Sequence, residues 1–273
     1  MNTRQFYING LWVDPIESTE FHVINPSNER VVATISLGSE DDSNRAIDAA
    51  SHAFNTWSVS TKNERLDLMA SILENYLACR NEITNAISQE MGAPIDLATN
   101  MQFDSDTYHL KEFIKAFQDF SFERTLDPDI LSDKIILEPI GVCGLITPRS
   151  WPISQVVLKI MAGLAAGCTM VFKPSTASPI SGMLFANVLH IAGVPDGVFN
   201  LINGNGTGVG TALSQHPSVT MISFSGSSQL GIATTNKVAD PIKPIQALHS
   251  TWRMNEFFEE KSTGGWSLHN AVS

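Results

Sequence analysis

The chain has 273 residues, of which 43% are hydrophobic and 16% charged, and its mean hydropathy is close to zero. Such a composition is typical of a folded protein with one large or two moderate domains. A net charge of −11, without any cluster of five basic residues, argues against nucleic acids and anionic membranes as partners.

Short strands and then long helices are predicted in the first half of the chain. Residues 6–37 alternate apolar runs with turn signals, which is typical of hairpins. Ser39, followed by acidic residues, predicts the start of a helix. Apolar residues at helical spacing predict further helices over 62–79, 80–91 and 94–120. The expected buried positions in the first and last of these helices are Leu66, Met69, Ala70, Leu73, Leu77, Tyr108, Phe113, Phe117 and Phe120.

In the second half of the chain the sequence pattern changes from helices to alternating strands and helices. Segment 126–138 contains a proline and several acids before an alternating stretch, and it is predicted to be a projecting loop and strand. After it, four strands alternate with four helices. This succession predicts an α/β fold with a doubly wound, parallel, Rossmann-like sheet that carries helices on both faces. The predicted elements are strands 142–147, 169–172, 198–202 and 221–224 and helices 153–166, 179–192, 208–216 and 227–239.

Three features of the sequence point to a cytoplasmic protein. The N-terminus has neither an apolar core nor a small-residue cleavage site, so no signal peptide is expected. No window reaches about 18 apolar residues, so no membrane span is expected. Cys79, Cys143 and Cys168 are odd in number and far apart, and each lies in an apolar run, which predicts buried thiols.

Ligands of doubly wound sheets bind beyond the carboxyl ends of the strands, so the loops at these ends are candidate sites. Gly204–Gly210 follows a strand and opens a helix, and Phe224–Gly231 repeats this pattern one unit later. Such glycines let the backbone approach a diphosphate, but a turn that needs positive φ explains them equally well. Lys173 ends a buried strand, where it faces either a cleft or the surface.

Three segments at the carboxyl ends of predicted strands resemble motifs of the NAD(P)-dependent aldehyde dehydrogenase family in order and spacing. Leu145–Pro152, Val171–Ser175 and Phe224–Gly231 are similar to the family's Ile-Thr-Pro-Trp-Asn-Trp-Pro, Phe-Lys-Pro-Ser-Glu and Phe-Thr-Gly-Ser-Thr segments. The resemblance covers residues 6–246 and includes Glu90-Met-Gly-Ala-Pro. It implies that residues 1–246 form the cofactor-binding part of such an enzyme, with NAD or NADP as cofactor.

The resemblance also implies roles for individual residues. Lys173 would hold the adenosine ribose, Gly206 and Gly210 would lie under the adenine end, and segment 126–138 would pair subunits in a homo-oligomer. Ile146, Thr147 and Pro148 would line the nicotinamide side of the cofactor. The residues that would hold the diphosphate and close the adenine pocket are Gly226, Ser227 and Leu230. The implied cofactor-binding set is completed by Arg149, Ser175, Thr176 and Phe224.

Two substitutions depart from the family's pattern within these motifs. The family's Trp-Asn pair is Arg149-Ser150 here. That asparagine donates a hydrogen bond to the developing oxyanion, an interaction worth about 3 kcal/mol, so Ser150 predicts weaker oxyanion stabilisation. The acid that follows Lys-Pro-Ser in many NAD-preferring members is Thr176 here, which leaves the choice between NAD and NADP open.

A third departure follows Gln246. There the family continues into Leu-Glu-Leu-Gly-Gly, whose glutamate is the general base, and later reaches the nucleophilic cysteine. In this sequence no cysteine lies beyond Cys168, and residues 247–273 are interpreted as an unrelated tail, for which a shifted reading frame is one explanation. Its acids Glu256, Glu259 and Glu260 are interpreted as a solvated helical turn.

We therefore expect the cofactor-binding fragment of an aldehyde dehydrogenase, which converts aldehydes to carboxylic acids, without activity of its own. Two alternatives stay open. The chain is either a non-catalytic module that binds a dinucleotide or pairs with another subunit, or a remnant whose fold is marginal because it exposes apolar surface.

Overall fold

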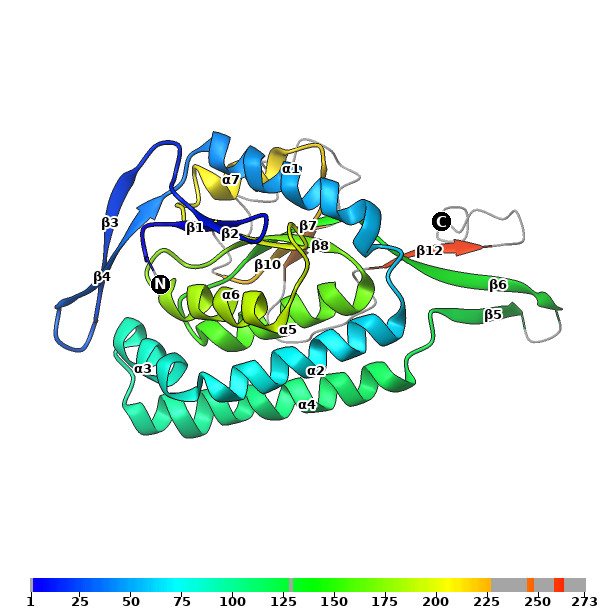
Figure 1. Cartoon of the computed structure of the whole chain (residues 1–273), viewed down its shortest axis with the longest axis horizontal. Coiled ribbons are helices and arrows are strands. Elements are labelled where there is room, and N and C mark those ends of the chain that lie inside the picture. The colour runs from blue at the N-terminus through cyan, green and yellow to red at the C-terminus, as the bar shows by residue number, and fades with distance from the viewer. Residues whose placement is uncertain (1, 128–129, 227–244, 248–257, 263–273) are drawn as a thin grey trace.

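The computed structural model describes residues 2–127, 130–226, 245–247 and 258–262. Its centre is a sheet with strand order β11-β10-β7-β8-β9-β1-β2 (Figure 1). The first five strands in this order are parallel to one another. Strand β1 pairs antiparallel with β9, and β2 pairs antiparallel with β1. The parallel strands are β7 (Val142–Ile146), β8 (Thr169–Lys173), β9 (Phe199–Leu201), β10 (Val219–Phe224) and β11 (Ile245–Ala247); the antiparallel ones are β1 (Phe6–Ile8) and β2 (Leu11–Val13).

Helices cover both faces of this sheet. One face carries α1 (Glu40–Trp57) and α7 (Val209–Gln215), and the other carries α5 (Pro152–Ala166) and α6 (Ile180–Ala192) (Figure 1). An outer layer packs against α5 and α6 and consists of α2 (Lys62–Ala78), α3 (Arg80–Met91), η1 (Leu97–Phe103) and α4 (Asp104–Asp119). The predicted α/β fold with a parallel, doubly wound sheet is confirmed. The helix predicted at 227–239 lies outside the described residues.

The helix starts follow from local sequence. Ser39 caps α1 in a reciprocal pair, because Asp42 N–H donates to the Ser39 hydroxyl at 3.3 Å and Ser39 N–H donates to the Asp42 carboxylate at 2.9 Å. Thr61 and Glu64 form the same arrangement at the start of α2. The helix start predicted at Ser39 is therefore confirmed.

The buried faces of two outer helices differ from the prediction. In α2 the residues of the buried face are Arg65, Met69, Ile72 and Tyr76, whereas Ala70 and Leu77 are exposed. Helix α2 carries apolar residues on more than one side, so its packing against α5 and α6 decides which side is buried. In α4, Asp106, Leu110 and Phe117 share the buried face, and Tyr108, between them, points outward with 62% exposure.

Segment 94–120 is also less regular than predicted, because Leu97–Phe103 is a π-helix that leads directly into α4. A π-helix accommodates extra residues per turn, and these segments are frequent near functional sites. Among the described residues, no helix is long and apolar enough to cross a membrane.

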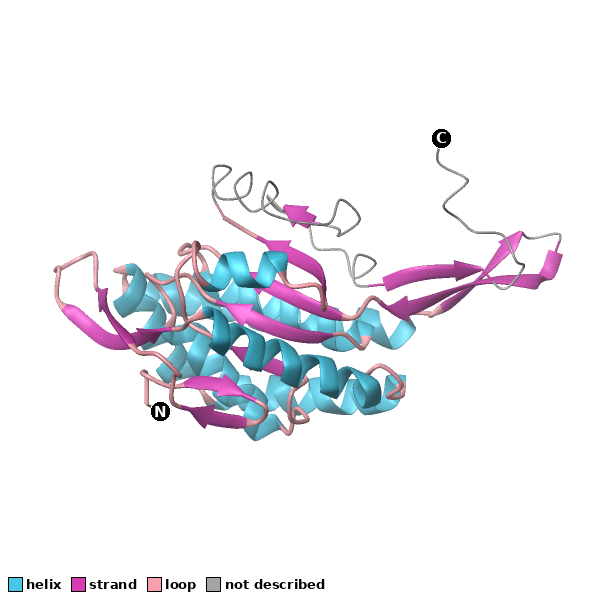
Figure 2. Cartoon of the chain, turned by 90° about the horizontal axis from the view of Figure 1, so that it is seen from above, coloured by secondary structure: helices cyan, strands magenta, loops and turns pink. Residues whose placement is uncertain are grey.

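Two antiparallel hairpins project from the body of the molecule. One consists of β3 (Thr19–Ile24) and β4 (Val31–Leu37), and the other of β5 (Glu123–Asp127) and β6 (Ile130–Pro139) (Figures 1 and 2). The prediction of a loop and strand over 126–138 was wrong in part, because the first strand begins at Glu123. Strand β12 (Phe258–Ser262) pairs with the other edge of β6, so Glu259 and Glu260 lie in a strand and not in a helical turn.

Candidate functional site

A cavity of about 630 Å³ opens at the carboxyl ends of β7, β8 and β10. The chain runs from β7 through β8 to β9 in one direction along the sheet and then returns to β10 on the other side of β7. Such a reversal of strand order separates the loops that follow neighbouring strands, and the resulting crevice is where doubly wound folds bind ligands. The position of the cavity therefore follows from the topology of the sheet.

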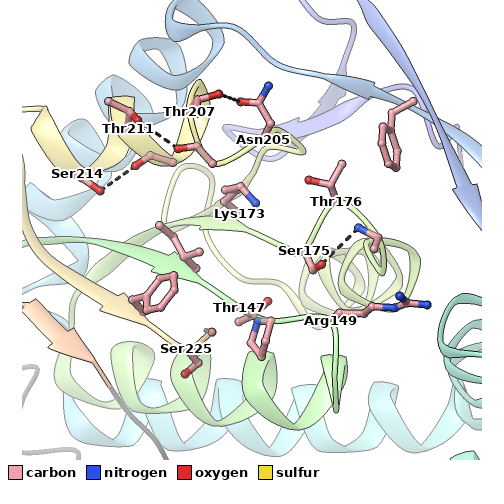
Figure 3. Close-up of a pocket in the computed structure, with 18 residues that line it drawn as sticks. Thr147, Arg149, Lys173, Ser175, Thr176, Asn205, Thr207, Thr211, Ser214 and Ser225 are labelled. Atoms are coloured by element: carbon pink, nitrogen blue, oxygen red, sulfur yellow. Dashed lines mark hydrogen bonds between the residues drawn. The ribbon is translucent and has the colours of Figure 1, made fainter. Parts of the chain in front are cut away.

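Most of the residues predicted to bind a cofactor line this cavity (Figure 3). They are Ile146, Thr147, Pro148, Arg149, Lys173, Ser175, Thr176, Gly206, Gly210, Phe224 and Gly226. Ser150 is exposed and is not part of the lining. Ser227 and Leu230 lie outside the described residues.

The sequence interpretation missed several lining residues. Thr211 and Ser214 lie on one face of α7, and Thr207 lies in the turn before it; their spacing by four and three residues is a signal that the sequence pattern could have revealed. Phe21 belongs to the β3–β4 hairpin, far away in sequence, and no local signal marks it. The remaining ones, Ala177, Asn205 and Ser225, lie in loops at the carboxyl ends of the strands, which the sequence marked as candidate sites without assigning these residues individually.

Lys173 lies at the centre of the site (Figure 3). Its side chain is 5% exposed, and its Nζ donates a hydrogen bond to the Pro174 carbonyl oxygen at 2.8 Å. Burial lowers the pKa of this ammonium group to about 8. Of the two alternatives open from the sequence, the structure favours the cleft, because the lysine is buried in the wall of the cavity.

The charges of the lining favour an anionic ligand. The cavity wall, as far as the structure describes it, holds the cations Lys173 and Arg149 and no carboxylate. The chain as a whole carries a net charge of −11, so this distribution is local. Threonine and serine residues also line the wall, and their hydroxyl groups are hydrogen-bond donors and acceptors suited to a ligand rich in oxygen.

Ser225 joins two loops of the cavity wall. Its backbone N–H donates to the Ile146 carbonyl oxygen at 2.9 Å, which fixes the loop after β10 next to the loop after β7. Its hydroxyl is buried in the cavity wall and has no hydrogen-bond partner among the described residues. Buried polar atoms are normally hydrogen-bonded, so this hydroxyl is an exception within the wall.

The glycines at the two ends of segment 204–210 serve different purposes. At Gly204 a Cβ atom would lie 2.3 Å from the Val209 side chain, so close packing within the chain explains this glycine. At Gly210 the nearest atom to a Cβ would be 3.6 Å away, which leaves the site open to the cavity. Asn205 shapes the loop between them, because its side-chain oxygen accepts a hydrogen bond from Gly208 N–H at 2.6 Å.

Comparison with known proteins gives consistent matches. The model of the aldehyde dehydrogenase family matches residues 12–250. A 3-succinoylsemialdehyde-pyridine dehydrogenase from Pseudomonas sp is 42% identical over 243 residues, which are 89% of this chain and 50% of that protein. A putative aldehyde dehydrogenase from Staphylococcus saprophyticus is 38% identical over 244 residues, again 89% of this chain and 50% of the relative.

Solved structures match over the same extent. An aldehyde dehydrogenase from Bartonella henselae has a TM-score of 0.89 at 46% identity, covering 90% of this chain and 52% of its own. A mutant aldehyde dehydrogenase from Pseudomonas syringae, crystallised with NAD+ and octanal, has a TM-score of 0.86 at 39% identity, covering 90% and 50%. The chain thus spans about half the length of the relatives it matches.

Proposed function

Because the chain belongs to the aldehyde dehydrogenase family, we propose that its cavity binds NAD or NADP as the cofactor platform of such an enzyme. The observation that carries this proposal is the cavity wall, whose described residues include the cations Lys173 and Arg149 and several serines and threonines but no carboxylate. In a bound dinucleotide, the diphosphate would pair with the cations, and the ribose hydroxyls would form hydrogen bonds with the serines and threonines.

Individual residues then take roles that the family resemblance implies, and we add roles for Thr176, Ser225 and Arg149 because they also belong to the cavity wall. Lys173 and Thr176 hold the adenosine ribose, and Gly206 and Gly210 admit the adenine end. Gly226 and Ser225 lie at the diphosphate, where Arg149 contributes a guanidinium group in place of the family's tryptophan. Thr147 and Pro148 line the nicotinamide side. When the nicotinamide group is bound, it supplies the acceptor for a hydride, and the protein supplies its position and its shielding from water.

The purified 273-residue chain is expected to bind NAD or NADP without oxidising aldehydes. Its only cysteines are Cys79, Cys143 and Cys168, and none of them lines the cavity, so no thiolate is placed to attack an aldehyde. Calorimetric titration measures binding, and absorbance of the reduced cofactor measures turnover. A lack of binding of either cofactor up to about millimolar concentration contradicts the proposal, and aldehyde-dependent reduction contradicts the expected inactivity.

Thr176→Glu is expected to make the site selective for NAD. The Thr176 hydroxyl donates to the Gly204 carbonyl oxygen at 3.0 Å and places no charge beside the ribose, so we expect the unmodified chain to bind both cofactors with affinities within about tenfold. A carboxylate at this position opposes a 2′-phosphate by about 1–3 kcal/mol, which weakens NADP binding about tenfold to a hundredfold. Thr176→Gln, equal in shape but neutral, is the control; an equal loss in both variants refutes the electrostatic explanation.

A second candidate function is pairing with another subunit through the β5–β6 hairpin. The hairpin projects from the body, and β5 forms an edge of its sheet, which leaves backbone donors and acceptors open for a further strand (Figure 2). We expect a homo-oligomer whose mass, measured by light scattering, falls to that of one chain when residues 124–138 are replaced by a short turn. The same variant should still bind the dinucleotide, and an unchanged mass argues against this interface.

A further inference from the structure

Three hydrogen bonds tie the outer helix α3 to the first turn of α6. Glu90 lies fully buried near the end of α3 and is not among the residues that line the cavity. Its carboxylate oxygens accept hydrogen bonds from Ile180 N–H at 2.6 Å, from Ser181 N–H at 3.2 Å and from the Ser181 hydroxyl. These donors belong to the first turn of α6, so Glu90 fixes the position at which this helix begins.

The first turn of α6 follows directly on a segment of the cavity wall. Segment 174–179 joins Lys173, at the end of β8, to Ile180, at the start of α6. The residues of this region that line the cavity are Lys173, Ser175, Thr176 and Ala177 (Figure 3). Because the segment is short and β8 is fixed within the sheet, any shift of the first turn of α6 must be taken up by these wall residues.

Segment 174–179 is also bonded to two other loops of the cavity wall. The Thr176 hydroxyl donates to the Gly204 carbonyl oxygen at 3.0 Å, in the loop after β9. The Ser178 hydroxyl donates to the Arg149 carbonyl oxygen at 3.1 Å, in the loop after β7, and Ser178 is 1% exposed. The loops after β7, β8 and β9 are therefore joined through this segment, and α3 holds its far end.

Helix α3 also contacts the β3–β4 hairpin, which contributes Phe21 to the cavity wall. Gly92 ends α3 with a φ of 70°, and a Cβ atom at this position would lie 2.8 Å from Pro26 Cγ and 2.9 Å from the backbone nitrogen of Ser27. Position 92 therefore requires glycine, both for its positive φ and for this close approach. Two elements of the cavity wall thus pack against the end of α3.

We propose that Glu90 is a positioning residue of the dinucleotide site: it holds the start of α6 and thereby sets where Ser175 and Thr176 lie in the cavity wall. The inference rests on the proposed cofactor binding. Glu90 does not line the cavity, so it acts on the affinity only through the residues that it holds. Without its carboxylate, the buried donors of Ile180 and Ser181 lack an acceptor, and the first turn of α6 shifts to satisfy them.

Glu90→Ala is expected to weaken binding of NAD and NADP about tenfold in a chain that is still folded. Calorimetric titration measures the affinity, and denaturant unfolding verifies that the variant is folded under the same conditions. Leu110→Ala is the control for lost stability, because Leu110 is fully buried in α4, which packs against α2, α5 and η1. It should change the affinity by less than about twofold. Glu90→Gln keeps one acceptor oxygen and should lose less than about threefold.

Two further variants test the route and guard against misfolding. Ser178→Ala removes the hydroxyl that joins the segment to the loop after β7, so its loss of affinity should not add to that of Glu90→Ala in the double variant. Because Glu90→Ala can fail to fold, Glu90→Asp provides a second test: its shorter carboxylate cannot reach all three donors and should also weaken binding.

The possible results separate this inference from the proposed function. Additive losses in the double variant overturn the proposal, although the proposed cofactor binding then stands. The same holds if Glu90→Ala, or Glu90→Asp in its place, binds the cofactors no more weakly than Leu110→Ala does. If the unmodified 273-residue chain binds neither NAD nor NADP, the proposed function and this inference fail together.

Discussion

Replacing Lys173 by methionine is expected to weaken binding of the dinucleotide about tenfold to a hundredfold. Lys173 is the buried cation of the cavity wall, and a charge-assisted hydrogen bond to a ligand contributes about 1.5–3 kcal/mol. Methionine fills nearly the same volume without the charge, so the fold should stay intact. Calorimetric titration with NAD and NADP measures the loss.

The control for this variant is Lys134→Met, since Lys134 lies in β6 and forms an exposed ion pair with Glu123 at 2.7 Å. It should leave the affinity unchanged. The affinity of the unmodified chain should also fall as the pH rises through about 8, where the Lys173 ammonium loses its proton. Lys173→Met should lack that dependence, and an undiminished affinity in this variant removes Lys173 from the proposed site.

Replacing Glu90 by alanine is expected to lower the free energy of unfolding by about 2–4 kcal/mol. Glu90 lies fully buried in α3, and its carboxylate accepts hydrogen bonds from Ile180 N–H at 2.6 Å, from Ser181 N–H at 3.2 Å and from the Ser181 hydroxyl. Helix α6 has no side-chain cap of its own, so Glu90 satisfies its first turn from outside. Alanine would leave these buried donors without an acceptor.

Denaturant unfolding measures this effect, with Glu82→Ala on the exposed side of the same helix as the matched control. Glu82→Ala should change stability by less than about 0.5 kcal/mol. Equal stability of the Glu90 and Glu82 variants contradicts the assigned role of Glu90.

The same carboxyl group makes stability depend on pH. Burial raises the pKa of Glu90 from 4.5 to about 7, although its hydrogen bonds oppose the shift. The folded chain therefore binds the proton of Glu90 more tightly than the unfolded chain does. The contribution of this proton to the free energy of unfolding is complete below pH 4.5 and is lost as the pH rises through about 7. Its upper limit is about 3 kcal/mol.

Asp106, whose pKa burial likewise raises to about 7, acts in the same direction. Glu90→Gln should therefore reduce, but not abolish, the decline in stability between about pH 5 and pH 8. An unchanged decline in Glu90→Gln would show that other groups cause it.

Local sequence determined the secondary structure of this protein and the identity of most groups around the cavity. Capping at Ser39, the period of the apolar residues, and the alternation of strands and helices after Gly141 depend on neighbours along the chain, so they can be recognised without a fold. Lys173 and Gly206 could be selected for the same reason, since ligands of parallel sheets meet the loops at the carboxyl ends of strands.

Only the tertiary structure decided which of these loops meet and which side of each helix is buried. The return of the chain to β10 beside β7 brings Ser225 next to Ile146, and the β3–β4 hairpin adds Phe21; neither contact has a signal within a short window of sequence. Arg65 can lie on the buried face of α2 because carbonyl groups of α5 and of the turn before α2 accept hydrogen bonds from its guanidinium. Burial and long-range hydrogen bonding fix such choices, and both arise only when distant segments pack together.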